Sequence, residues 1–329
     1  MHDYNKVIQE LIRLGIIDSS EIFDYEFSPL KEIYQNYFDY CQENLLNHCH
    51  EYNIQPARFF FSNHYGVNAK AGLIKDYFVI GVNMDTIHTA YELFYEQNNI
   101  FDENPILSEM FLELSDKLDV PFGFLMFQMT TLFTYHHELA HLVQKSSLLE
   151  TGFHEQYGIG HEIEYSIEKH VLEFDADIQG ANAICFQLLE YFKKLPNEDQ
   201  TIKNLSKLMS LGITSIFSYF LICFNKTKNL YYKKFSHPHP LIRICYVLDC
   251  FVAVVEENFP FKNVKLKPEN LIRFGFSISD IFFRSKTQYQ HLTGEFQSQF
   301  IDKTDGIEYY INELLEYSKT MKNLMINRK

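Results

Sequence analysis

Residues 136–142 read His-His-Glu-Leu-Ala-His-Leu and contain the pattern HExxH between His137 and His141. If this stretch is helical, residues four positions apart share one face, so the two imidazoles point to the same place. Glu138 is the next residue, about a quarter of a turn round the helix, where its carboxylate can reach a water molecule without binding the metal. Two histidines and a glutamate in this order are typical of the catalytic zinc site of metallopeptidases.

The surroundings of this motif favour a buried helix. Positions 120–137 carry no Asp, Glu, Lys or Arg, and this uncharged window ends directly at Glu138. Because unpartnered polar groups are costly to bury, histidines and a glutamate in such a helix indicate a bound partner such as a metal ion. The bare pattern also arises by chance roughly once in twenty chains of this composition, so the interpretation depends on a third ligand.

A second acidic motif offers that ligand. Residues 172–177 read LEFDAD, in which Glu173 and Asp177 are again four positions apart. Glu173 would complete a set of two histidines and one carboxylate that leaves a position open, and Asp177 would accept the other ring N–H of a ligand histidine. The close spacing of HExxHxxGxxH is absent, because positions 144 and 147 are Gln144 and Ser147. Three further residues remain as alternative third ligands, namely Asp175, His161 and His170.

A third polar group lies further along the chain. Residues 236–240 read Ser-His-Pro-His-Pro, and Arg243 follows His237 by six positions. The prolines restrict the backbone here, so a corner of this kind can hold an imidazole and a guanidinium near a site as the chain enters a helix. A His-Pro pair on its own is more often a simple turn. The segment is therefore a candidate only together with the two motifs before it.

Composition limits the class of protein. The 329-residue chain has a formal charge of −14, which argues against general binding to nucleic acids or anionic membranes. It has 31 Phe and 22 Tyr but no Trp, which favours a large core packed from aromatic rings. Six cysteines without a CxxC pair indicate free thiols in a reducing compartment, and the N-terminus lacks the uninterrupted apolar stretch of a secretion signal. We therefore expect a cytoplasmic protein.

Two uncharged windows, 120–137 and 208–225, are each about long enough to cross a membrane. Both contain several Ser or Thr side chains, and the first also contains Gln and His. Polar residues scattered in this way are more typical of helices buried in a protein core than of membrane spans. We therefore expect two core helices and no membrane contact.

The predicted fold class is α+β, mostly helical, with a small early β-sheet next to the HExxH helix. The clearest strands are 57–62 (ARFFFS) and 77–83 (YFVIGVN), which are rich in β-branched and aromatic residues. Helical patterns dominate elsewhere, including an amphipathic helix over 307–326, and Gly275 is expected to break a helix. We divide the chain into three parts that form one compact unit: an N-terminal helical segment 1–56, a catalytic core 57–258 and a C-terminal helical segment 259–329.

Taken together, the three motifs resemble a known family. HHELAH (136–141), EFDAD (173–177) and SHPHPLIR (236–243) look like the motifs of the Lit-type phage-exclusion peptidases of bacteria and, more distantly, of the HtpX-like gluzincin metallopeptidases. The resemblance runs through short motifs from about residue 68 to residue 245 and implies a zincin-like fold. It also implies zinc ligands at His137, His141 and Glu173, a general base at Glu138, a supporting carboxylate at Asp177, and His237 and Arg243 near the active site.

A fourth segment adds to this resemblance. Residues 68–71 read Asn-Ala-Lys-Ala, which is similar to the Asn-Ala-x-Ala strand of HtpX-like enzymes. The resemblance implies that Asn68, Ala69 and Ala71 belong to an edge strand beside the metal. Such a strand binds an extended substrate by backbone pairing.

The resulting hypothesis is a zinc-dependent metallopeptidase, with Zn²⁺ as cofactor and an intracellular protein or peptide as substrate. Resemblance to the Lit-type family implies a setting in antiphage defence. The alternatives are a non-catalytic, zinc-stabilised sensor or interaction protein, a membrane protease of the HtpX type, and an HExxH pattern without metal. No pattern in the sequence specifies the oligomeric state.

Overall fold

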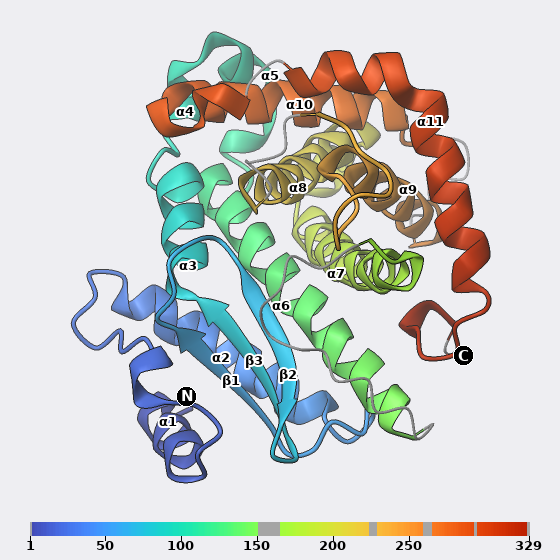
Figure 1. Cartoon of the computed structure of the whole chain (residues 1–329). Coiled ribbons are helices and arrows are strands. Elements are labelled where there is room, and N and C mark those ends of the chain that lie inside the picture. The colour runs from blue at the N-terminus through green and yellow to red at the C-terminus, as the bar shows by residue number, and fades with distance from the viewer. Residues whose placement is uncertain (1, 151–164, 224–228, 259–264, 293–294, 328–329) are drawn as a thin grey trace.

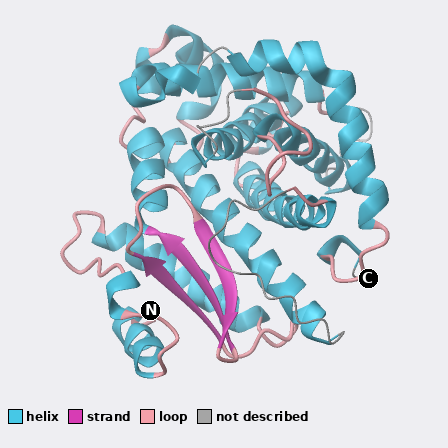
Figure 2. Ribbon diagram, viewed as in Figure 1, coloured by secondary structure: helices cyan, strands magenta, loops and turns pink. Residues whose placement is uncertain are grey.

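The structure, a computed structural model, describes residues 2–150, 165–223, 229–258, 265–292 and 295–327. The described chain is mostly helical and has one three-stranded sheet near its N-terminus (Figures 1 and 2), which confirms the α+β class. Its α-helices are α1 (Tyr4–Arg13), α2 (Lys31–His48), α3 (Met84–Ala90), α4 (Ile100–Glu103), α5 (Pro105–Ser115), α6 (Phe122–Glu150), α7 (Ile167–Lys193), α8 (Ile202–Cys223), α9 (Pro240–Asn258), α10 (Pro268–Ser285) and α11 (Glu295–Ser318).

The sheet has the order β1-β3-β2, formed by β1 (Ala57–Ser62), β2 (Ala69–Ile74) and β3 (Tyr77–Asn83). Both strands predicted from the sequence are confirmed with the same bounds. β1 runs parallel to β3, whereas β2 is antiparallel to it. The β2–β3 hairpin turns through Lys75 and Asp76, whose φ angles of 47° and 67° suit a tight two-residue turn. This topology makes β2 an edge strand, and it lies alongside α6.

Aromatic rings fill the space between the N-terminal helices and the sheet. Tyr4 and Phe38 meet edge to face, as do Tyr34 and Phe61, and Phe59 contacts Phe61 in the same way. All five side chains are buried. The expected aromatic core is therefore present, and it fixes α1 and α2 against β1.

Helices α6 and α7 pack closely and hold the HExxH motif of α6 beside the LEFDAD motif of α7. Gly180 of α7 makes this approach possible, because a Cβ atom there would lie 2.8 Å from the Phe133 ring of α6. Helix α9 packs on α7, and α8 lies against α6, α7 and α9. The HExxH segment and the LEFDAD segment are thus held on two neighbouring rigid elements, as predicted.

Helix α8 is the one helix in the described part of the chain that is long and apolar enough to cross a membrane. Its most apolar window is 89% buried by other parts of the protein, which is the usual environment of a core helix.

Helix α10 packs against α8. The prediction that Gly275 breaks a helix was wrong. Gly275 lies inside α10, and a Cβ atom there would come 2.9 Å from Ile213 of α8, so this glycine permits a helix contact and breaks no helix.

The C-terminal segment also differs from its prediction. Helix α11 ends at Ser318 and does not extend to residue 326. The chain then folds back, and a short 3₁₀ turn at Met325–Asn327 packs against α7. The Asn327 side chain donates to the carbonyl oxygens of Ser318 and Met321, at 2.9 and 2.7 Å, and so satisfies acceptors at the end of the helix. Figure 1 shows the chain turning back toward α7 after the end of α11.

Candidate metal centre

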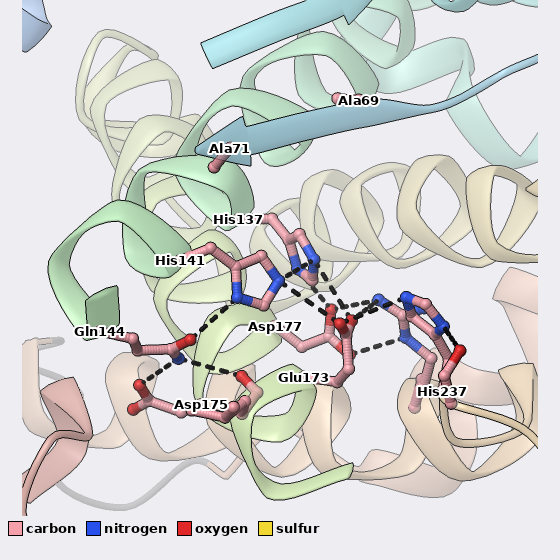
Figure 3. Close-up of polar contacts among 12 residues, drawn as sticks. Ala69, Ala71, His137, His141, Gln144, Glu173, Asp175, Asp177 and His237 are labelled. Atoms are coloured by element: carbon pink, nitrogen blue, oxygen red, sulfur yellow. Dashed lines mark hydrogen bonds and ion pairs between the residues drawn. The ribbon is translucent and has the colours of Figure 1, made fainter. Parts of the chain in front are cut away.

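Three side chains from α6 and α7 converge on one point (Figure 3). The Nε2 atoms of His137 and His141 lie 3.1 Å apart. The carboxylate of Glu173 faces both rings, with Oε2 at 3.4 Å from His137 Nε2 and Oε1 at 3.4 Å from His141 Nε2. These are the three ligands predicted from the sequence, and the fold brings them together.

The spacing and the chemistry of this group fit a metal ion. Zinc bonds of about 2.0–2.1 Å in a tetrahedral arrangement would place neighbouring ligand atoms about 3.3 Å apart. Glu173 Oε2 is buried and accepts no hydrogen bond among the described residues, although the Arg243 guanidinium lies near it, with Nη2 at 3.7 Å. Two imidazole nitrogens and a carboxylate oxygen are also a donor set that suits zinc. The group can therefore hold a metal ion.

His137 is supported by a buried ion pair behind it. Its Nδ1 lies 2.9 Å from Asp177 Oδ1, although the ring N–H is not well aligned with that oxygen. Asp177 in turn accepts two hydrogen bonds from Arg243, at 2.7 Å from Nε and 2.6 Å from Nη2, and a third at 2.5 Å from the Tyr246 hydroxyl. The structure thus places Asp177 and Arg243 in direct contact with each other behind the ligand histidine.

Burial and neighbouring charged groups shift the pKa values of the side chains in this cluster. Burial by itself would raise the pKa of Glu173, but the facing His237 and His141 hold it well below its usual range. Burial opposes protonation of His137, yet the carboxylates of Asp177 and Glu173 outweigh it and raise the pKa of this imidazole to about 10. Burial likewise opposes ionisation of Asp177, and Arg243 lowers its pKa below the usual value. The carboxylates of Glu173 and Asp177 therefore stay ionised, and in this structure His137 and Arg243 face them as their counter-charges.

His237 reaches the same cluster from the segment before α9. Its Nε2 lies 3.2 Å from Glu173 Oε1, while its Nδ1 and the Ser236 hydroxyl are 2.8 Å apart. Its side chain is 39% exposed, so it is open to an incoming molecule. The Ser-His-Pro segment, a weak signal on its own, thus lies at the site (Figure 3).

The segment that carries His237 is anchored by a buried histidine. His170 Nε2 lies 2.7 Å from the Phe235 carbonyl oxygen, and His170 Nδ1 lies 2.7 Å from the Tyr310 hydroxyl. Burial lowers the pKa of His170 to about 4, so the ring is neutral at neutral pH and donates through Nε2 while it accepts through Nδ1. Its partners hold both nitrogens away from the cluster, and His170 is not a ligand.

The remaining alternative ligands do not join the cluster either. Asp175 is fully buried, but its carboxylate accepts hydrogen bonds from Gln144 and from the backbone of Met325 and Ile326. Figure 3 shows it on the side of His141 away from Glu173. His161 lies outside the described residues.

A cavity of about 380 Å³ opens over the cluster. Glu138 lines it beside the two histidines and is itself only 6% exposed. Glu138 therefore faces the space in front of the cluster while lying outside the group of three converging ligands. Other lining residues come from β2 and the residue before it, from α6, α7, α8 and α9, and from the segment before α9, among them Asn68, Ala69, Ala71, Lys145, Tyr219 and His237.

The edge strand β2 presents its backbone to this cavity. Asn68 O accepts a hydrogen bond from Asn83 N of β3, and backbone groups along an antiparallel strand alternate in direction. The peptide groups of Ala69 and Ala71 therefore point away from β3, toward α6 and the cavity. The ammonium group of Lys145 donates to Ala71 O, and the Asn68 side chain accepts from Ala69 N. Ala69 and Ala71 thus lie in an edge strand beside the cavity, whereas Asn68, predicted to belong to the same strand, directly precedes it.

Sequence reasoning missed the support of the second histidine. His141 Nδ1 lies 2.9 Å from Gln144 Oε1, and Gln144 Nε2 donates to Asp175 Oδ2 at 2.8 Å. One signal was available, because residues three positions apart on a helix share a face, which places Gln144 next to His141. Tyr246 had a similar signal, three positions after Arg243 on α9.

No protein-family model, no curated protein and no solved structure matches this chain.

Proposed function

We propose that this protein is a zinc metallopeptidase with a zincin-like core. The observation that carries the proposal is the convergence of His137, His141 and Glu173 beneath a cavity that Glu138 also lines. Two histidines, one carboxylate and an open side are the ligand pattern of catalytic zinc sites, whereas structural zinc sites have four protein ligands. Support for the zincin-like core comes from the edge strand that runs beside the HExxH helix.

Zinc bound here would polarise a substrate carbonyl and lower the pKa of a water molecule to about 7. The protein's own residues would transfer the proton, stabilise the intermediate and position the ligands. Glu138 takes the proton of the attacking water and passes it to the nitrogen of the leaving amine. His237 is exposed enough to donate a hydrogen bond to the oxygen of the tetrahedral intermediate. Asp177 and Arg243 keep the His137 ring in place.

Substrate would bind as an extended strand along β2. The outward peptide groups of Ala69 and Ala71 offer backbone hydrogen bonds, and they lie beside the cavity that contains Glu138. Lys145 already donates to Ala71 O, so a bound substrate must share this carbonyl or displace the lysine. An intracellular protein or peptide is the proposed substrate class, with a cytoplasmic location and an antiphage setting proposed by resemblance alone.

The change Glu138→Gln tests this function in the purified protein. The amide keeps the size of the side chain but cannot accept the proton, so hydrolysis of a mixed peptide library is expected to fall by about 10²–10⁴-fold. Zinc content should stay at the wild-type level, because Glu138 is outside the ligand set. Cleavage sites and rates are measured by mass spectrometry of the library.

Glu190→Gln is the matched control, since Glu190 is an exposed glutamate of α7 that pairs with Lys193. It should cleave the library like the wild type. Full activity of Glu138→Gln would contradict the role given to Glu138. Zinc-loaded wild type that cleaves no peptide would instead favour the non-catalytic sensor.

A further inference from the structure

A continuous set of hydrogen bonds connects the second ligand histidine to the C-terminal turn. It begins at His141, whose Nδ1 lies 2.9 Å from Gln144 Oε1. Gln144 Nε2 donates to Asp175 Oδ2 at 2.8 Å and to the Leu172 carbonyl at 3.0 Å. Asp175 Oδ2 also accepts from Met325 N at 3.0 Å, and Asp175 Oδ1 accepts from Ile326 N at 2.9 Å.

The direction of these bonds is consistent along the whole set. His141 Nε2 faces the cluster, so the ring proton belongs on Nδ1, which donates to the Gln144 carbonyl oxygen. The Gln144 amide group is then oriented to donate to Asp175, whose carboxylate only accepts. The two backbone N–H groups complete the set at the far end. Reversing the Gln144 amide would break the bonds at both of its ends.

Asp175 depends on the C-terminal turn for most of its partners. It is 0% exposed, and the turn supplies two of its three hydrogen bonds. A buried carboxylate that loses donors is strongly destabilised, so it must recruit water or move. Either change disturbs the Gln144 side chain, which is bonded to the same carboxylate, and thereby frees the His141 ring to rotate.

We propose that the C-terminal turn, Met325–Asn327, positions the metal ligand His141 through Asp175 and Gln144, so that docking of the turn and metal binding stabilise each other. The inference rests on the proposed metal site and adds a dependence on the chain's own C-terminal segment. Asp175, Gln144 and the turn lie outside the set of metal ligands, and Asp175 and the turn also lie outside the lining of the cavity, so they act as positioning elements. Outer groups that hold ligand histidines typically contribute 10–100-fold to metal affinity.

His137 provides an internal contrast. Its support comes from Asp177, with Arg243 and Tyr246 behind it, and these residues lie on α7 and α9. Displacing the C-terminal turn should therefore loosen one ligand while the other stays in place. The metal would be held more weakly and released faster, but the site would still form.

The first test compares two truncated forms of the full chain, one ending after Leu324 and one ending after Asn327. The shorter form lacks both amide donors to Asp175, whereas the longer form keeps them. Zn²⁺ affinity is measured by competition with a chromophoric chelator. We expect the shorter form to bind Zn²⁺ about 10-fold more weakly than the longer form. Affinities within twofold of each other would overturn the inference.

A matched pair of single substitutions isolates the amide in case the shorter form does not fold. Met325→Pro removes one N–H donor, and proline is well tolerated at the first position of a helical turn. Met325→Ala keeps that donor and removes most of the side chain. Zn²⁺ affinity should fall about 3-fold in the proline variant and stay within about 1.5-fold in the alanine variant. Equal affinities in the two would count against the inference.

A readout on the turn itself separates positioning from general stability. Coupling between two sites is reciprocal, so Zn²⁺ must protect the turn by the factor that the turn contributes to Zn²⁺ affinity. Hydrogen exchange at the Met325 and Ile326 amides should slow about 10-fold on adding Zn²⁺, and this effect should disappear in Gln144→Met. Unchanged exchange would overturn the coupling. Wild type that binds no Zn²⁺ would instead overturn the proposed metal site itself.

Discussion

Glu173→Gln should remove stoichiometric zinc from the protein. The carboxylate supplies one of three ligands and the only negative charge within the ligand set, and its Oε2 atom lacks a hydrogen-bond partner among the described residues. Loss of a supporting outer group costs 10–100-fold in metal affinity, so loss of a direct ligand should cost more, at least about 100-fold. Competition with a chelator measures the affinity, and elemental analysis after dialysis measures the zinc content.

Thermal unfolding provides a second measure of the same change. A ligand that binds only the folded state raises its stability by RT ln(1 + [L]/Kd), so added zinc should raise the Tm of the wild type. The rise should be much smaller in Glu173→Gln and unchanged in the exposed control Glu190→Gln. One tightly held zinc per chain in Glu173→Gln would mean that the ion sits elsewhere.

Arg243→Met should give the largest loss of stability of any single change at the site. Arg243 is 3% exposed, makes two hydrogen bonds to the fully buried Asp177 and stacks on the Phe220 ring, with its Cζ 4.1 Å from the ring centre. Methionine fills much of the same space but leaves Asp177 charged and buried without its main partner. Breaking a buried pair in this way costs about 3–5 kcal/mol. Urea unfolding with a chelator present measures this cost without any contribution from bound metal.

Two controls make this result specific. Arg243→Lys keeps the charge but loses the bidentate hydrogen bonding of the guanidinium group. Its free energy of unfolding should therefore lie between those of the methionine variant and the wild type. Lys233→Met breaks the exposed pair with Glu313 and should cost less than about 1 kcal/mol. A loss below 1 kcal/mol in Arg243→Met would show that Asp177 does not depend on this arginine.

Much of the site could be predicted because its residues repeat at helical spacing. His137 and His141 share a face by their separation of four, and so do Glu173 and Asp177, which fixes two pairs of groups before any tertiary structure is known. Strands β1 and β3 were equally clear, because aromatic and β-branched residues fill both. Patterns of this kind determine the local arrangement of side chains without any tertiary contact. The structure confirmed each of them.

The edge strand and the C-terminal turn could not be predicted in the same way. The β2 sequence AKAGLI is rich in residues that disfavour strands, and its pairing depends on the turn at Lys75 and Asp76. The bonds between Asp175 and the C-terminal turn join residues 150 positions apart. Nothing in the sequence around Asp175 indicates where its donors come from. Only the docking of α11 and the turn on α7 reveals that this carboxylate supports the site.

The most direct test of the central claim compares protein N-termini in cells that express either the wild type or Glu138→Gln. Both proteins should contain one zinc per chain, so they differ only in the group that moves the proton. A zinc peptidase predicts new termini from one or more host proteins with the wild type and their absence with Glu138→Gln. Identical sets of termini from the two zinc-loaded proteins would contradict the account.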